Sequence, residues 1–112
     1  MQLAAETRGG ALVVTAMEDR IDAAGAIRFK ERMRDAAGTE ARRVVLDLSR
    51  VTFVDSSGLG AIVAVMKLLG PDRRLELSGL TPNVQKVFRL TRLDGVFTIH
   101  DGLPAQDLRD AG

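Results

Sequence analysis

The sequence predicts an α/β domain built on a mixed, mostly parallel sheet of about five strands with about four helices, in the order β-β-α-β-α-β-α-β-α. Short apolar runs alternate along the chain with longer segments in which apolar residues recur at helical spacing. The run VVLDL at 44–48 is nearly continuous and rich in β-branched residues, which is typical of a central strand covered on both faces. The chain has 112 residues and no repeat, low-complexity tract or linker, so residues 1–112 are expected to form one domain.

The first part of the chain predicts a hairpin followed by one helix. Residues 12–17 form an apolar strand, and a glycine pair before it makes residues 2–7 the partner strand. Residues 26–37 place charged side chains between apolar ones at the spacing of an amphipathic helix. The residues that bound these elements are two turn glycines, a helix-capping aspartate and a terminating glycine, namely Gly9, Gly10, Asp22 and Gly38.

The rest of the chain continues the alternation of strands and helices. Glycine, proline and capping residues mark the ends of each element. After the central strand, the sequence predicts a helix ending near Leu69 before Gly70-Pro71, a strand at 75–78, a helix from Thr81-Pro82 to Leu90, a strand at 96–99 and a short helix at 103–109.

The composition excludes several classes of function. Sixteen basic and fifteen acidic residues give a net charge of +1, which offers no basic face for nucleic acid. The chain contains no cysteine and one histidine. Disulfides and thiolate chemistry are therefore excluded, and neither a metal nor another cofactor is expected.

Membrane attachment is not expected either. The first eight residues lack the basic head and apolar run of a signal peptide. The longest strongly apolar stretch, 59–69, contains Lys67 and falls short of the ~20 residues that a membrane span needs. We therefore expect a cytoplasmic protein, and its balanced charge favours a monomer.

The tetrapeptide Asp55-Ser56-Ser57-Gly58 is the most informative feature of the chain. It stands at the start of a predicted helix, where unpaired backbone N–H groups and the helix dipole favour an anion. A phosphate ester on Ser56 or Ser57 would meet those donors. Gly58 and Gly60 remove side-chain bulk, which would let the active site of another protein approach the hydroxyl. Taken alone, the same tetrapeptide is also an ordinary helix cap.

The helix that follows is apolar almost all round. One stripe suits packing on the sheet and consists of Leu59, Ile62, Val63, Met66 and Leu69. A second apolar stripe consists of Ala61, Ala64, Val65 and Leu68, which leaves Lys67 as the only charge. Such a helix is either buried on every side or covered by a partner, and the first is harder to satisfy in a small two-layer domain. We therefore expect the second stripe to form part of a partner-binding surface.

Three segments resemble the STAS domain of bacterial anti-sigma factor antagonists, and together they cover nearly the whole chain. FVDSSGLGAIVAVMKLL, preceded by VVLDLSRV, is similar to the phosphorylation segment of that family. EDRIDAAGAIRFKERM resembles the family's G-E-hydrophobic-D strand end and first helix, and LTPNVQKVFRLTRLDGVFTI its third helix and final strand. The resemblance implies the STAS fold, phosphorylation of Ser56 with Ser57 as the fallback acceptor, and an acidic residue near that site at Asp22.

The chain departs from the family pattern before its first long helix. The family's Gly-Glu ahead of the hydrophobic position corresponds to Asp19-Arg20 here. The resemblance therefore leaves the partner surface around residues 18–22 undefined, but it does not affect the serine.

The resemblance implies a partner switch with no catalytic residue of its own. An anti-sigma factor with a serine-kinase ATPase fold would bind the unmodified protein, phosphorylate it and then release it, and a PP2C-type phosphatase would remove the phosphate. The residues expected to bind the partner lie around the helix start and on the second stripe, namely Asp22, Asp55, Ser57, Gly58, Gly60, Ala61, Ala64, Val65 and Leu68.

Other classes fit the sequence less well. A serine hydrolase would need G-x-S-x-G, whereas Val54 and Asp55 stand two residues before the serines, and His100 lies near the end of the last predicted strand. A dinucleotide site would need a glycine at position 63, which is valine. Within the fold, the alternative is a STAS subunit of a stressosome or of a lipid-transport ABC complex, which would bind its partner without this phosphorylation.

Overall fold

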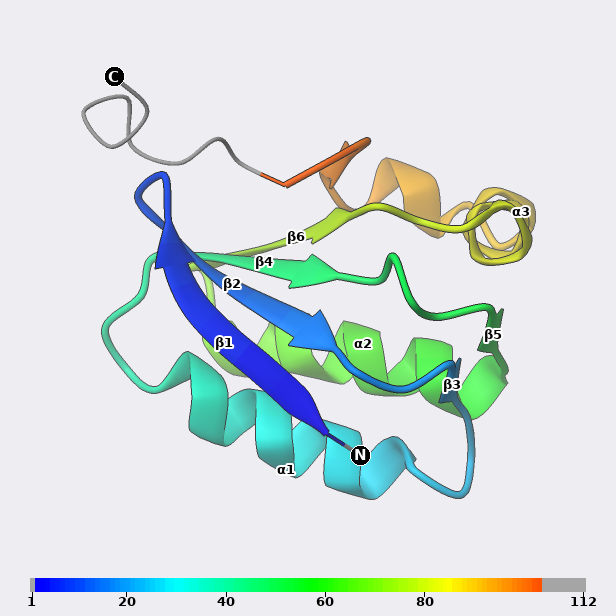
Figure 1. Cartoon of the computed structure of the whole chain (residues 1–112), viewed down its shortest axis with the longest axis horizontal. Helices are drawn as coiled ribbons and strands as arrows, with labels where there is room; N and C mark the ends of the chain where they lie inside the picture. The colour runs from blue at the N-terminus through cyan, green and yellow to red at the C-terminus, as the bar shows by residue number, and fades with distance from the viewer. Residues whose placement is uncertain (1, 104–112) are drawn as a thin grey trace.

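The structure, a computed structural model that describes residues 2–103, is organised around a five-stranded mixed sheet (Figure 1). The strands are, in spatial order, β1 (Leu3–Arg8), β2 (Ala11–Ala16), β4 (Arg43–Asp47), β6 (Arg74–Ser78) and β7 (Ile99–His100). β1 pairs antiparallel with β2, and every other pair in this sheet is parallel. The predicted α/β fold class with a mixed, mostly parallel sheet is confirmed.

Two short strands and three helices complete the described part of the chain. β3 (Arg20–Ile21) and β5 (Phe53–Val54) pair in parallel outside the main sheet. The helices are α1 (Ala26–Ala37), α2 (Ser56–Leu69) and α3 (Pro82–Leu90), and a 3-10 turn follows at Leu93–Gly95. Within residues 2–103, no helix has the length and apolar character needed to cross a membrane.

The hairpin of β1 and β2 turns at Gly9 and Gly10, whose φ angles are 57° and 79°. Residues with a side chain rarely adopt such positive φ, so a glycine pair suits this tight connection. The turn aligns Arg8 with Ala11 and fixes the register of the two strands. As a result, Val14 of β2 faces the main core.

The main core lies between the sheet and the two helices α1 and α2, which cover the same face (Figure 1). Strand side chains alternate between the faces of a sheet, so Val14, Leu46 and Leu77 share the face that packs against the helices. The helices bury residues that recur at helical spacing, namely Ala26, Phe29, Met33 and Ala37 of α1 and Leu59, Ile62, Val65 and Leu69 of α2.

The opposite face of the sheet carries a smaller buried cluster. Ala11, Val13 and Val45 are buried there, and Leu103 packs against them. On the same face the carboxylate of Glu76 is buried beside Arg43 of β4 and His100 of β7. A polar group therefore stabilises this face together with the apolar side chains.

The end of α1 is held by Arg73, which lies immediately before β6. Its guanidinium donates hydrogen bonds to the carbonyl oxygens of Ala37, Gly38 and Ala41, at 2.8, 2.9 and 2.6 Å. The last carbonyl groups of a helix have no partner within the helix, so these bonds satisfy groups that would otherwise need water. They also fix the end of α1 against the start of β6.

The structure differs from the sequence expectations at several boundaries. Asp22 does not cap the first long helix, because α1 begins at Ala26 with Gly25 as its N-cap and without a side-chain cap bond. The last strand is later and shorter than 96–99, because the chain first forms the 3-10 turn. The helix expected at 103–109 lies, after Leu103, outside the described residues.

Candidate functional site

The start of α2 is positioned by the two short strands β3 and β5. Their parallel pairing aligns Arg20 with Phe53 and Ile21 with Val54. The buried side chains of Ile21 and Val54 anchor both strands in the main core. Asp55, which follows β5, is therefore held beside the loop that leads from β3 to α1.

Asp55 caps α2 and joins it to that loop. One carboxylate oxygen, Oδ1, accepts a hydrogen bond from the backbone N–H of Gly58 at 2.8 Å, and Oδ2 accepts one from the N–H of Ala23 at 3.0 Å. The bond from Gly58 is the main cause that lowers the pKa of Asp55, with help from Ala23, Ser57 and the charge of Arg20, while burial acts in the opposite direction. The carboxylate of Asp55 is therefore ionised near neutral pH.

Ser56 and Ser57 lie on the first turn of α2, and both are exposed. The structure thus places both predicted phosphate acceptors at the surface. The expectation that the helix start offers free N–H donors needs correction, because Gly58 already donates its N–H to Asp55. A phosphate in this position would share the helix start with an ionised carboxylate.

The two glycines of the motif differ in their surroundings. Gly58 is buried, and a Cβ built there would overlap the carbonyl oxygen of Ile21. Gly60 is exposed, and a Cβ there would meet nothing within 4 Å. Gly58 therefore allows α2 to pack closely on β3, and only Gly60 offers the open approach that the sequence suggested for both.

The expected partner surface on α2 is only partly exposed. Ala61 and Val65 retain 3% and 1% of their exposure, because α1 packs on this side of α2. Including Gly58, three of the residues expected to contact a partner are thus interior, which corrects the sequence interpretation. Gly60 and Leu68 are exposed, and Ala64 is half-buried.

Asp22 does not cap a helix, and it lies on the segment 21–23 that contacts Asp55 through the backbone of Ile21 and Ala23. Its Oδ2 accepts a hydrogen bond from Arg20 Nε at 3.1 Å, and its carbonyl oxygen accepts one from the N–H of Gly25 at 3.0 Å. The backbone N–H of Asp55 lies 3.4 Å from the carbonyl oxygen of Ile21, which brings the two aspartate segments side by side.

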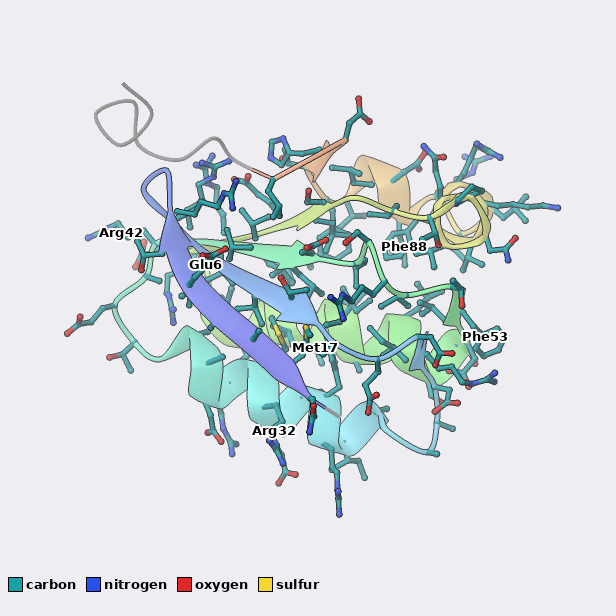
Figure 2. The ribbon with its side chains drawn as sticks, viewed as in Figure 1. Glu6, Met17, Arg32, Arg42, Phe53 and Phe88 are labelled. Atoms are coloured by element: carbon teal, nitrogen blue, oxygen red, sulfur yellow. The ribbon has the colours of Figure 1, made fainter. Side chains whose placement is uncertain are left out.

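Two residues of this region were missed by the sequence analysis. The guanidinium of Arg20 stacks over the ring of Phe53, 4.4 Å from its centroid. Phe53 is 42% exposed, and Figure 2 shows it at the edge of the molecule. Neither lies in a long periodic segment, so no helix or strand pattern marks them. The only sequence feature that pointed to Arg20 was the departure from the family pattern at Asp19-Arg20.

The one histidine of the sequence, His100, pairs with Glu76 and not with a serine of the motif. His100 Nε2 lies 2.7 Å from Glu76 Oε1 on the other face of the sheet. Within residues 2–103, no group of three or more histidine, cysteine, aspartate or glutamate side chains is arranged to hold a metal ion. The site is thus an exposed pair of serines on a capped helix start, bordered by carboxylates.

The comparisons with known proteins agree with this fold. The family model of the STAS domain matches residues 2–105. BtrV of Bordetella bronchiseptica, provisionally named as an anti-sigma factor antagonist, is 28% identical over 89 residues, which are 79% of this chain and 77% of BtrV. The anti-sigma-B factor antagonist of Staphylococcus aureus is 29% identical over 62 residues, which are 54% of this chain and 57% of that protein.

Solved structures extend the similarity. An anti-sigma factor antagonist from Mycobacterium paratuberculosis has a TM-score of 0.80 at 25% identity, covering 91% of this chain and 86% of that one. Phosphorylated SpoIIAA of Bacillus has a TM-score of 0.63 at 21% identity, covering 89% and 91%, and shares the fold. The chain belongs to the STAS domain family, and relatives that it matches are named as anti-sigma factor antagonists. The STAS family of anti-sigma factor antagonists is non-enzymatic.

Proposed function

We propose that this protein is a phosphorylation-controlled partner switch. In its unmodified form it binds an anti-sigma factor with a serine-kinase ATPase fold, and phosphorylation of Ser56 releases that partner. A PP2C-type phosphatase restores the binding form. The proposal also assigns the protein to the cytoplasm and to a monomeric state.

Ser56, an exposed residue at the first position of a capped helix, carries this proposal. It occupies the position at which the family resemblance expects the acceptor. Relatives named as anti-sigma factor antagonists support the partner class, and the phosphorylated form of the structural neighbour SpoIIAA supports the modification. Ser57 is the second acceptor on the same turn.

In the phosphorylation step, the Oγ of Ser56 attacks the γ-phosphorus of ATP held by the kinase. The bond from that phosphorus to the β–γ bridging oxygen breaks, ADP leaves, and the hydroxyl proton passes to a base of the kinase. Asp55 serves as a positioning residue. It fixes the first turn of α2 and so holds Ser56 at the surface.

Release follows from charge. A phosphoserine adds about −1.5 to −2 charges near neutral pH. Here that charge lies next to the ionised Asp55 and in the same region as Asp22, so an interface that desolvates the site would bury like charges together. A loss of about 3–4 kcal/mol would weaken the affinity by roughly a few hundredfold, which is enough to change partners.

The test is a phosphorylation assay with candidate serine kinases of the anti-sigma type from the same genome. We expect ATP-dependent modification that mass mapping assigns to Ser56, loss of it in Ser56→Ala, and its retention in the matched control Ser57→Ala. Modification found only on Ser57 would contradict Ser56 as the phosphate acceptor and assign that role to Ser57. A stable complex with an ABC-type ATPase and no phosphorylation would instead reject the switch.

A further inference from the structure

Helices α1 and α2 leave an open groove between them, which we call the α1–α2 groove. It has a volume of about 330 Å³ and is lined by Ile27, Lys30 and Arg34 of α1 together with Ala64 and Leu68 of α2. Val65, which is almost completely buried, also contributes to its lining. The groove is distinct from the exposed serines, although α2 contributes to both.

Two large apolar side chains line this groove although they are exposed to solvent. Ile27 is 69% exposed and Leu68 is 53% exposed, and they lie in the same groove on different helices. Single exposed aliphatic residues are common on protein surfaces. A pair that faces a common hollow is different, because one inserted apolar side chain would cover both at once.

The polar side chains of the groove are mainly cationic. Lys30 and Arg34 lie one helical turn apart on α1, and Glu31 is the only acidic residue in the lining. Lys67 follows Ala64 by about one turn on the exposed side of α2. Within residues 2–103, Arg34 makes only a long, exposed ion pair with Asp35 at 3.9 Å, and neither lysine has an ion-pair partner.

The groove lies within reach of a protein that is bound at Ser56. Ala64 follows Ser56 by eight residues on the same helix, so the groove begins about 12 Å along the axis of α2 from the phosphate acceptor. The exposed Gly60 lies between them and adds no side chain. A stable interface covers about 800 Å² on each partner, so one partner can span both features.

We propose that the α1–α2 groove docks an acidic amphipathic helix of the partner protein that acts on Ser56. The identity of that partner rests on the proposed function, whereas the chemistry of the helix follows from the groove. Its apolar side chains, spaced by one helical turn, insert between Ile27 and Leu68, and its carboxylates pair with Lys30 and Arg34.

A peptide titration tests the groove without any kinase. The probe is a synthetic helical peptide of about 15 residues, built of leucine, alanine and glutamate with the leucines on one face. The control peptide carries lysine in place of each glutamate. We expect the acidic peptide to shift the methyl NMR signals of Ile27 and Leu68 in the full chain, and the basic peptide to leave them unchanged. Equal shifts with both peptides, or none at these methyl groups, would overturn the proposal.

Matched variants test the same groove with the kinase. The double variant Lys30→Glu, Arg34→Glu and the variant Ile27→Ser should each weaken kinase binding by about tenfold or more. Arg32→Glu is the control, because Arg32 is exposed on α1 and points away from the body of the molecule (Figure 2). Wild-type affinity in the groove variants would reject the groove and leave the switch at Ser56 intact. Binding of the acidic peptide without any kinase activity at Ser56 would reject the switch and leave the groove.

Discussion

At Gly58 the backbone of α2 passes directly over β3. A Cβ in this position would overlap the carbonyl oxygen of Ile21 and approach Cγ1 of Val54 at 3.0 Å. Gly60, two residues further on, has open space around it. Both glycines belong to one short motif, and their spacing alone does not distinguish the one that serves packing from the one that leaves a surface open.

These two glycines give a matched pair of substitutions. Gly58→Ala should lower the free energy of unfolding by about 1–3 kcal/mol, because the added methyl group overpacks α2 against β3. Gly60→Ala should raise it by about 0.5–1 kcal/mol, because alanine favours the helix and meets no neighbour. Urea unfolding of both variants measures the difference. A stabilising effect of Gly58→Ala would contradict the close contact of α2 with β3.

The residues of the site that could be predicted from sequence are those with a local physical role. Asp55 is a good helix cap by composition, and Ser56 follows it on the first turn, so both were assigned correctly to the start of α2. Asp22 has the same capping chemistry, yet Gly25 caps α1 instead. The turn that ends with the bond from Gly25 N–H to the carbonyl of Asp22 separates the aspartate from the helix, and nothing in the composition of residues 22–25 marks it.

At the scale of whole elements, the long segments were predictable and the short ones were not. α2 and α3 begin directly after the capping residues Asp55 and Thr81, and α2 ends directly before Gly70-Pro71. These residues are local signals in the sequence. The strands β3 and β5 have two residues each, which is too short for any periodicity. The side of α2 that carries Ala61 and Val65 would be apolar whether it packed inside the domain or bound a partner. Only the three-dimensional placement of α1 shows that this side is interior.

Glu76 joins three strands of the sheet into one electrostatic unit. Its Oε1 accepts a hydrogen bond from Arg43 Nε of β4 at 3.0 Å and lies 2.7 Å from His100 Nε2 of β7. Arg74 of β6 is 3.7 Å from the second carboxylate oxygen. Burial raises the pKa of Glu76, but the hydrogen bonds and charges of His100 and Arg43 outweigh it, so the pKa lies below the ordinary value of 4.5.

This lowered pKa predicts a dependence of stability on pH. The folded protein favours the ionised form of Glu76 more than the unfolded chain does, so its contribution is complete above about pH 4.5 and is lost as the pH falls through the folded pKa. Glu76→Gln should lower the free energy of unfolding by about 1–3 kcal/mol near neutral pH. The difference in the free energy of unfolding between Glu76→Gln and the wild type should become smaller below about pH 4.5, as measured by urea unfolding across the acid range. The exposed control Glu40→Gln should follow the wild-type curve, and a gap for Glu76→Gln that stays constant with pH would contradict the assignment.

For the molecule as a whole, the fold separates the proposed phosphorylation surface from the core. The sheet, α1 and the buried residues of α2 form the main core, whereas Ser56 lies at an exposed helix end. A negative charge near a helix N-terminus is favourable or neutral for the helix itself. A phosphate can therefore change what the protein binds without changing how it folds.

The last prediction compares stability and binding in the same samples. Phosphorylated wild type should unfold within a few degrees of the unmodified protein, since about 1 kcal/mol corresponds to roughly 4–8 °C in a domain of this size. Its affinity for the kinase partner should fall by roughly a few hundredfold. Ser56→Ala should keep the unmodified affinity, and Ser56→Asp should lose part of it, because one carboxylate supplies less charge than a phosphate. Calorimetry gives both quantities for each form. Equal affinities of Ser56→Ala and Ser56→Asp, or a phosphorylated protein that no longer folds, would mean that charge at this helix start does not act through the interface.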